Sequence, residues 1–380
     1  MRGLRSQSLV ESERPLTPAL SPEYGGEGVE DARPATTQKT QSKHNTIIYN
    51  PLPILSSDCC ELMQYLIVFL TSSAWFDPQW LVGAGGLALG LGGCAGLTVV
   101  EWAAWVLVLP SRRPGALEAQ VGVADDSAGE PIEAVAADGV ALAGLWHPAE
   151  PSVAKGRAVL VIHGFAEDPA ALRARMVALN RHGWDVAALD ARAHGRSGGD
   201  RGSFGGRETA DVAAWIDALT QSGKLGNGPL AVWGRSMGAA IALRATAENR
   251  GVSALVLEAP YLDLKTTLRL VLRRRRVPLS SVFAPLILGR AERLAGASLS
   301  KPRPIDVAPA VVAPTLVVHG AADSLIPAAD AQRLAQAFAT PADYFEVPGA
   351  GHTNIIEVGG PELLDRIASF LDHAVAGVAS

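Results

Sequence analysis

The chain contains the stretch Pro229-Leu-Ala-Val-Trp-Gly234-Arg-Ser236-Met-Gly238-Ala-Ala-Ile-Ala-Leu243. Its first part is an apolar run that predicts a buried strand, and its last part, from Gly238, predicts a helix. Between them stands Gly-x-Ser-x-Gly, on a turn where strand and helix crowd each other, so that only glycine fits at Gly234 and Gly238. This context predicts that the Ser236 hydroxyl is exposed as a nucleophile at the carboxyl edge of a sheet.

The sequence on both sides of this turn alternates strand-like with helix-like runs, which predicts βαβ units and a mainly parallel sheet with helices on both faces. Ahead of them, residues 131–146 predict an antiparallel hairpin that turns at Asp138-Gly139. The fold class is therefore α/β. The expected strands are residues 158–163, 185–190, 230–233, 254–257, 315–319 and 344–347, and the expected helices are 170–182, 208–222, 238–248, 328–339 and 362–375.

A serine hydroxyl needs a base and an orienting acid before it attacks a carbonyl. Both follow Ser236 after later strands: Asp323 lies just beyond the strand that ends near Gly320, and His352 lies in the loop Pro348-Gly-Ala-Gly-His352. The order Ser, Asp, His is the one that this elbow uses. Asp330 is the rival acid, but it lies inside an expected helix. We therefore expect Ser236, Asp323 and His352 to be the catalytic residues.

An oxyanion hole needs two backbone N–H donors. We expect one from Met237, the residue after the nucleophile, and the other from Phe165, in the loop after an early strand. Phe165 and Tyr261 are also the expected substrate-binding residues. His163 ends a buried strand, so we interpret it as structural. The segment 190–197, Asp-Ala-Arg-Ala-His-Gly-Arg-Ser, is interpreted as a rim loop held by its own side-chain hydrogen bonds.

The His-Gly-Phe loop, the Asp-x-Arg-x-His-Gly-x-Ser segment, the Gly-Arg-Ser-Met-Gly elbow, Asp323 and His352 together resemble a serine α/β hydrolase over about residues 130–376. The motif Gly-Arg-Ser-Met-Gly-Ala, with one membrane span ahead of it, resembles that of the membrane-anchored Bem46-like hydrolases and of the serine-aminopeptidase-like S33 group. The resemblance implies the α/β-hydrolase fold, with Ser236 as nucleophile, Asp323 as acid and His352 as base. Substrates in this family include esters, thioesters, lipids and some peptides, and the mechanism needs no metal or cofactor.

The N-terminal region divides into a tail and a membrane candidate. Residues 1–61 have no apolar period and are rich in Ser, Thr, Pro and Gly, so they are interpreted as a disordered tail. The alternative is that synthesis really begins at Met63. Residues 62–113 are interpreted as the membrane anchor, with a main span at about 79–109, because an apolar run of that length exceeds the ~20 residues that cross a bilayer.

The orientation of this anchor follows from its flanks. Arg112 and Arg113 come directly after the expected span, and the positive-inside rule then puts the hydrolase domain, residues 114–380, in the cytoplasm. Gly86 and Gly90 stand four residues apart, a spacing that lets two membrane helices approach closely. Glycine is also simply common in membrane helices, so the oligomeric state stays open.

Charge and cysteine content exclude several function classes. The chain holds 33 basic and 38 acidic residues, so it lacks the basic excess of a nucleic-acid-binding protein. Its three cysteines all precede residue 100, which excludes a cysteine nucleophile or a thiolate metal site in the hydrolase domain.

The segment at about 261–312 is interpreted as a short lid with helices at 264–276 and 279–294. Its run Arg273–Arg276 either receives an anionic head group or is a solvated face.

These features predict a membrane-anchored serine hydrolase that cleaves a carboxylic ester or thioester through an acyl-enzyme on Ser236. The expected partners are a small-molecule or lipid ester and the membrane, and no nucleic acid. A peptidase or an acyltransferase of the same fold is the first alternative. The second is a catalytically idle hydrolase fold that serves as a membrane scaffold.

Overall fold

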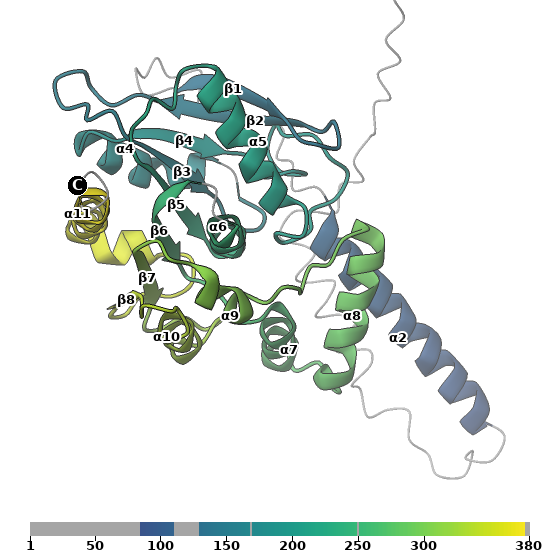
Figure 1. The fold of residues 1–380 in the computed structure, drawn as a ribbon. Helices are drawn as coiled ribbons and strands as arrows, with labels where there is room; N and C mark the ends of the chain where they lie inside the picture. The colour runs from purple at the N-terminus through teal and green to yellow at the C-terminus, as the bar shows by residue number, and fades with distance from the viewer. Residues whose placement is uncertain (1–83, 110–128, 168, 249–250, 377–380) are drawn as a thin grey trace, which may run out of the picture. The chain divides into compact units, whose positions relative to one another are not determined.

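The computed structural model describes residues 84–109, 129–167, 169–248 and 251–376. The expected tail at 1–61, Met63 and the first residues of the expected membrane span lie outside these ranges. The described residues form one mixed sheet with helices on both faces, and a helical insert interrupts the chain between two of its strands (Figure 1).

The sheet has eight strands in the order β1-β2-β4-β3-β5-β6-β7-β8. The first two strands are an antiparallel hairpin, and β2 pairs antiparallel with β4. All later pairs are parallel. The strands are β1 (Glu130–Val135), β2 (Ala141–His147), β3 (Ala158–Ile162), β4 (Asp185–Leu189), β5 (Leu230–Arg235), β6 (Val252–Glu258), β7 (Thr315–Gly320) and β8 (Asp343–Val347).

The central strands are buried on both faces, as their unbroken apolar sequences predict. In β3, Val159 and Val161 pack toward α4 (Arg173–Arg181) and α11 (Ile355–Ala376). Leu160 and Ile162 belong to the other core layer. That layer holds α5 (Glu208–Gln221), α6 (Met237–Ala247) and α10 (Ala328–Gln336), on the opposite face of the sheet (Figure 1). The α/β fold class is therefore confirmed.

The parallel arrangement brings the carboxyl ends of β5, β7 and β8 to one edge of the sheet. The loop after each of these strands begins at this edge, so residues that are far apart in sequence become neighbours there. Ser236 follows β5, Asp323 follows β7 and His352 follows β8. The sheet order thus determines which side chains meet.

The insert between β6 and β7 consists of α7 (Leu264–Arg274), α8 (Ser280–Ala295), α9 (Pro304–Val307) and a short 3₁₀ turn, Ala308–Ala310. The carboxylate of Asp263 caps α7 by accepting hydrogen bonds from the N–H groups of Lys265 and Thr266. Helix α8 ends at Gly296, which has a φ of 63° and closes the helix in the left-handed conformation.

Helix α2 (Ala84–Val108) departs from the expected membrane span at 79–109. Within the described residues, no helix has the length and apolar character needed to cross a membrane. The end of α2 packs instead on the rest of the chain, where Ala104 and Val108 are fully buried. Glu101, the single charge in the run, accepts hydrogen bonds of 2.5 and 2.8 Å from the Arg290 guanidinium of α8. The length of an apolar stretch in the sequence does not distinguish packing against the protein from burial in lipid.

Two helices differ from expectation at their ends. The helix expected at 362–375 begins earlier, at Ile355, but Gly360 interrupts it with a φ of 62°. Pro361 then restarts the helix, because a fixed φ near −65° suits a first helical position. The first turn of the helix expected at 170–182 is a separate 3₁₀ segment, Pro169–Leu172, and α4 proper begins at Arg173.

Candidate active site

The turn at Ser236 has the strained backbone that its sequence predicts. Ser236 has φ 51° and ψ −110°, outside the regions that most residues adopt. A Cβ on Gly234 would lie 2.1 Å from the carbonyl oxygen of Gly238, and a Cβ on Gly238 would lie 2.2 Å from that of Ile162. The N–H of Ser236 donates a 2.8 Å hydrogen bond to the carbonyl of Glu258, which holds the turn against β6.

The structure brings Ser236, His352 and Asp323 into one hydrogen-bonded chain. Ser236 Oγ lies 3.0 Å from His352 Nε2, and His352 Nδ1 lies 2.8 Å from Asp323 Oδ2. Ser236 and His352 are half-buried, whereas the Asp323 side chain is fully buried. Asp330, the rival acid, instead lies in the first turn of α10, 3.6 Å from Arg333. The geometry suits a neutral imidazole that donates to the carboxylate and accepts from the serine hydroxyl.

The Asp323 carboxylate is held on several sides. Its Oδ1 accepts hydrogen bonds of 2.7 and 2.8 Å from the N–H groups of Leu325 and Ile326. Burial acts to raise the pKa of Asp323, but the hydrogen bonds from His352 and from the Ile326 N–H leave this pKa below its ordinary value. The acid therefore stays ionised at neutral pH and orients the imidazole.

A second buried histidine, His319, lies beside this carboxylate. Its Nε2 is 3.0 Å from the carbonyl oxygen of Ile326 and 3.4 Å from Asp323 Oδ2. Burial lowers the pKa of His319, so the ring is neutral and its Nε2–H donates to the closer Ile326 carbonyl. His319 thus stabilises the loop that carries Asp323 without adding a charge next to it.

The two expected oxyanion donors lie at the start of α6 and after β3. Met237 is the first residue of α6, and the N–H of such a position has no acceptor inside its own helix. Phe165 stands in the loop after β3, where Gly164 N–H donates a 2.9 Å hydrogen bond to Glu167 Oε2. The packing of Gly238 against the Ile162 carbonyl brings these two segments together. Their function as an oxyanion hole stays a prediction.

The two expected substrate-binding residues have different surroundings. The half-buried Phe165 ring stacks on Phe204, with ring centroids 5.1 Å apart. Tyr261 is 3% exposed, and its hydroxyl has no hydrogen-bond partner among the described residues. Burial raises the pKa of Tyr261 to about 12. A substrate contact at Tyr261 stays a prediction.

Comparisons with known proteins identify the family of this chain. Residues 154–304 match the family model described as serine aminopeptidase, S33. Two uncharacterised proteins of Mycobacterium tuberculosis, from strains CDC 1551 and H37Rv, are each 32% identical to this chain over 251 residues, which is 66% of this chain and 82% of each relative. The chain belongs to the family of α/β serine hydrolases.

Solved structures resemble the hydrolase in fold. An esterase of Pyrococcus furiosus, Pf2001, gives a TM-score of 0.54 at 22% identity, covering 65% of this chain and 91% of that one. DcsB, solved with a substrate analogue, gives a TM-score of 0.53 at 19% identity, covering 65% of this chain and 99% of that one. At these identities the likeness establishes the α/β-hydrolase fold and nothing about the substrate.

Arg235, inside the elbow of the hydrolase, joins three segments of the site. Its guanidinium forms an ion pair with Glu167 of the loop after β3, and its Nε lies 3.4 Å from Glu258 at the end of β6. Its Nη2 donates a 3.3 Å hydrogen bond to the carbonyl of His352. Sequence reasoning missed this role. The one sign of it in the sequence is a charged residue, Arg235, inside a turn that is expected to be buried.

Glu258 anchors the same network on the sheet. It is completely buried and forms an ion pair with Arg175 of α4, whose Nε lies 2.8 Å from Glu258 Oε2. Burial acts to raise the pKa of Glu258, but the charges and hydrogen bonds of Arg175 and Arg235 outweigh it and leave this pKa below its usual range. The pair is therefore ionised and connects α4 to the elbow.

The rim segment 190–197 is held as its sequence predicts. Ser197 Oγ donates a 2.7 Å hydrogen bond to the Asp190 carbonyl, and the N–H of Arg196 donates one of 3.1 Å to Asp190 Oδ2. His194 packs edge-on against Phe165, with ring centroids 6.0 Å apart. The side chains of this segment support the loop around the site, and Ser197 has no part in the chain of Ser236, His352 and Asp323.

Proposed function

We propose that this hydrolase cleaves a carboxylic ester or thioester through an acyl-enzyme on Ser236. The observation that supports the proposal is the chain of hydrogen bonds of 3.0 and 2.8 Å from Ser236 through His352 to Asp323. A serine in this arrangement is activated by the adjacent base, and the buried acid fixes the tautomer of that base.

The reaction begins when Ser236 Oγ attacks the acyl carbonyl carbon and its proton passes to His352 Nε2. The carbonyl oxygen becomes an oxyanion, which the N–H groups of Phe165 and Met237 stabilise. The carbon–oxygen or carbon–sulfur bond to the leaving group then breaks, and the leaving group takes the proton from His352. Water, deprotonated by the same imidazole, attacks the acyl-enzyme and regenerates Ser236.

Arg235 has a positioning role in this scheme. It contacts the carbonyl of His352 and the carboxylate of Glu167, whose other oxygen holds Gly164 in the loop of Phe165. One guanidinium thus ties the base to the loop of one oxyanion donor. A displacement of a catalytic group by about 1 Å lowers the rate of the chemical step by about 100-fold. The contacts of Arg235 are therefore expected to affect turnover.

The experiment is labelling of the full chain with a fluorophosphonate, followed by hydrolysis of p-nitrophenyl esters from acetate to palmitate. Ser236→Ala and His352→Ala are the test variants, and Ser281→Ala, at an exposed serine of α8, is the matched control. We expect labelling of the native chain and of the control, and none of the two test variants. A folded native chain that resists the probe contradicts the proposal and favours the idle scaffold.

The choice among acyl substrates needs a second measurement. Rates on an acyl thioester and on an aminoacyl p-nitroanilide, compared with those on the ester, distinguish an esterase or thioesterase from a peptidase. Addition of a primary alcohol then tests for acyl transfer, because an acyltransferase forms the new ester in place of the free acid. A preference for the anilide would replace ester cleavage with peptide cleavage.

We also propose that the chain works at a membrane with its hydrolase domain on the cytoplasmic side. The support is the uncharged run from Gln79 to Val100 and the pair Arg112 and Arg113 after it. The test is fractionation of cells that express the full chain or a chain that begins at residue 129. Recovery of the full chain in the high-speed supernatant would overturn the membrane localisation. Protection of the hydrolase domain from a protease added on the cytoplasmic side would overturn its cytoplasmic orientation.

A further inference from the structure

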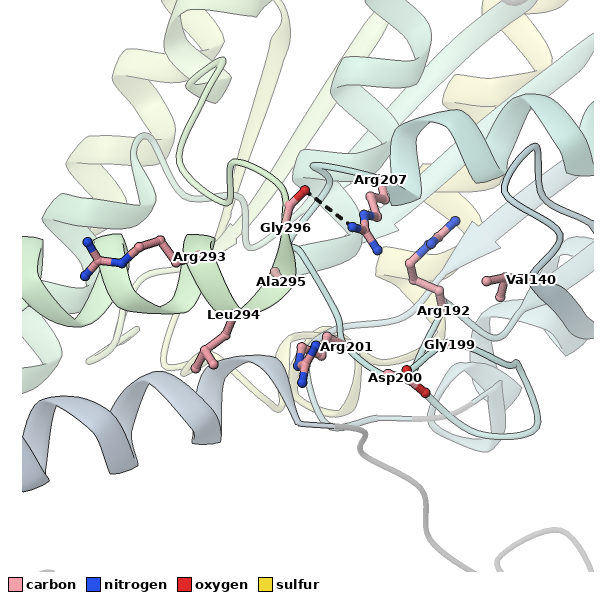
Figure 2. A pocket seen from close by; sticks show the side chains of 10 residues that line it. All are labelled: Val140, Arg192, Gly199, Asp200, Arg201, Arg207, Arg293, Leu294, Ala295 and Gly296. Carbon is pink, nitrogen blue, oxygen red and sulfur yellow. Dashed lines mark hydrogen bonds between the residues drawn. The ribbon is translucent and has the colours of Figure 1, made fainter. Parts of the chain in front are cut away.

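A cavity of about 400 Å³ lies between the loop after β4 and the end of α8. Figure 2 shows that its wall carries several guanidinium groups from different elements. A single acidic side chain, the exposed Asp200, faces four arginines in this wall. The lining residues are Val140, Arg192, Gly199, Asp200, Arg201, Arg207, Arg293, Leu294, Ala295 and Gly296.

One of these arginines is already neutralised. Arg192 donates hydrogen bonds of 2.7 and 2.5 Å to the two carboxylate oxygens of Asp211, and a third of 2.7 Å to Asp138. These two carboxylates more than compensate its single positive charge. Arg192 therefore forms a rigid part of the wall, and the positive charge of the cavity comes from the other three arginines.

Arg201, Arg207 and Arg293 form no ion pair within the described ranges of the chain. The guanidinium of Arg201 lies 5.1 Å from the centre of the Trp105 ring, and its Nε is buried without a hydrogen-bond partner among the described residues. Arg293 is exposed on α8. These three arginines come from the loop after β4, the start of α5 and the end of α8, and the guanidinium of Arg293 points away from those of Arg201 and Arg207 (Figure 2).

The backbone keeps one of these groups in place. Arg207 Nη2 donates a 3.3 Å hydrogen bond to the carbonyl of Gly296, as the dashed line in Figure 2 shows. Gly296 has a φ of 63°, and a Cβ there would lie 2.9 Å from the same nitrogen. Glycine therefore lets Arg207 approach α8 closely, while its remaining N–H donors stay available to a ligand.

We propose that this cavity binds a phosphate group carried by a small organic moiety. The planar guanidinium group matches the oxygens of a phosphate with paired hydrogen bonds, and several of them together suit a dianion better than a carboxylate. The volume exceeds what a lone phosphate fills and lies within the range of small-molecule sites. The proposal does not involve Ser236 and goes beyond the ester cleavage proposed above.

The position of the cavity allows two sources for this phosphate. The loop that carries Arg201 is bonded to the end of α2, where the N–H of Gly202 donates a 3.0 Å hydrogen bond to the carbonyl of Val108. A phospholipid head group and a soluble phosphate ester present the same chemistry to the three arginines. The experiment therefore includes both.

The test uses the full chain and three probes: sn-glycerol 3-phosphate, inorganic phosphate, and vesicles of phosphatidylcholine with or without phosphatidic acid. Calorimetry measures the soluble probes, and flotation measures the vesicles. The variants are Arg207→Gln and Arg201→Gln, and the matched control is Arg269→Gln, at an exposed arginine of α7 outside the cavity. Circular dichroism of every variant verifies that the fold is retained, and Ser236→Ala verifies that binding is independent of catalysis.

We expect glycerol 3-phosphate to bind the native chain and the Arg269→Gln control equally. Each cavity variant should weaken this binding about tenfold, the effect of losing one charge-assisted hydrogen bond. Binding of phosphatidic acid vesicles alone, with the same loss in the variants, assigns the cavity to a lipid head group. Failure of all three probes to bind, or equal binding by native chain and cavity variants, would overturn the proposal.

Discussion

His163 connects the site to the pH dependence of folding. It stands after β3 with none of its side chain exposed. Its Nδ1 lies 2.7 Å from the Gly164 carbonyl oxygen, and its Nε2 accepts a 3.0 Å hydrogen bond from the N–H of Ala191. The ring therefore carries its one proton on Nδ1. Burial, with a smaller contribution from the neighbouring His194, lowers the pKa of His163 to about 3.

This shift makes stability depend on pH in a defined direction. The unfolded chain protonates this histidine below about pH 6.5, whereas the folded chain does so only near pH 3. Between these values the unfolded state binds one proton more, so the free energy of unfolding falls by about 1.4 kcal/mol for each unit of decreasing pH. The loss is about 2 kcal/mol at pH 5, and the effect vanishes above about pH 7.5.

The perturbation is His163→Gln, which keeps a donor and an acceptor but does not titrate. Urea unfolding of both proteins, followed by the fluorescence of the buried tryptophans, gives their free energies from pH 5 to pH 8. We expect the variant to be less stable by about 1–3 kcal/mol at pH 8, because the paired hydrogen bonds fit it less well. This deficit should shrink by about 2 kcal/mol at pH 5.

The comparison of the two curves isolates His163. His147 and His319 also have pKa values that burial lowers, but they titrate in both proteins and cancel in the difference. Two parallel curves over this pH range would refute the reasoning, since they would mean that His163 gains its proton equally in the folded and unfolded states.

Three further substitutions test the site and its support. Gly238→Ala should cost more than about 3 kcal/mol of stability, because the new Cβ would lie 2.2 Å from the Ile162 carbonyl oxygen; an unchanged melting temperature would contradict this. Glu258→Gln should cost roughly 3–5 kcal/mol in urea unfolding, since it leaves the buried Arg175 without its carboxylate; a loss below ~1 kcal/mol would mean that water reaches the pair. Asp323→Asn should lower kcat by about 10⁴ with the fold retained, because the amide no longer selects the right tautomer of the base; ester assays beside circular dichroism measure both, and a kcat near that of the native enzyme would remove Asp323 from the mechanism.

The sequence by itself determined the elbow and the order of the candidate triad. Gly234 and Gly238 identify a turn that crowds strand against helix, and this information lies within five residues. The alternation of apolar runs predicted the parallel sheet, whose register then aligned the ends of β5, β7 and β8. Both signals are local in the chain, which is why a single sequence contains them.

Only the tertiary structure decided which distant residues support the site. Arg235 reaches the carbonyl of His352 across 117 positions, and Arg290 reaches Glu101 across 189. The same holds for the arginine cavity, whose walls come from segments that the sheet order and the lid bring together. An apolar run such as the end of α2 satisfies its hydrophobicity equally in lipid or against a protein core, so its sequence leaves the partner open. Contacts of this kind depend on packing between elements, and the local period and turn chemistry of a sequence do not specify them.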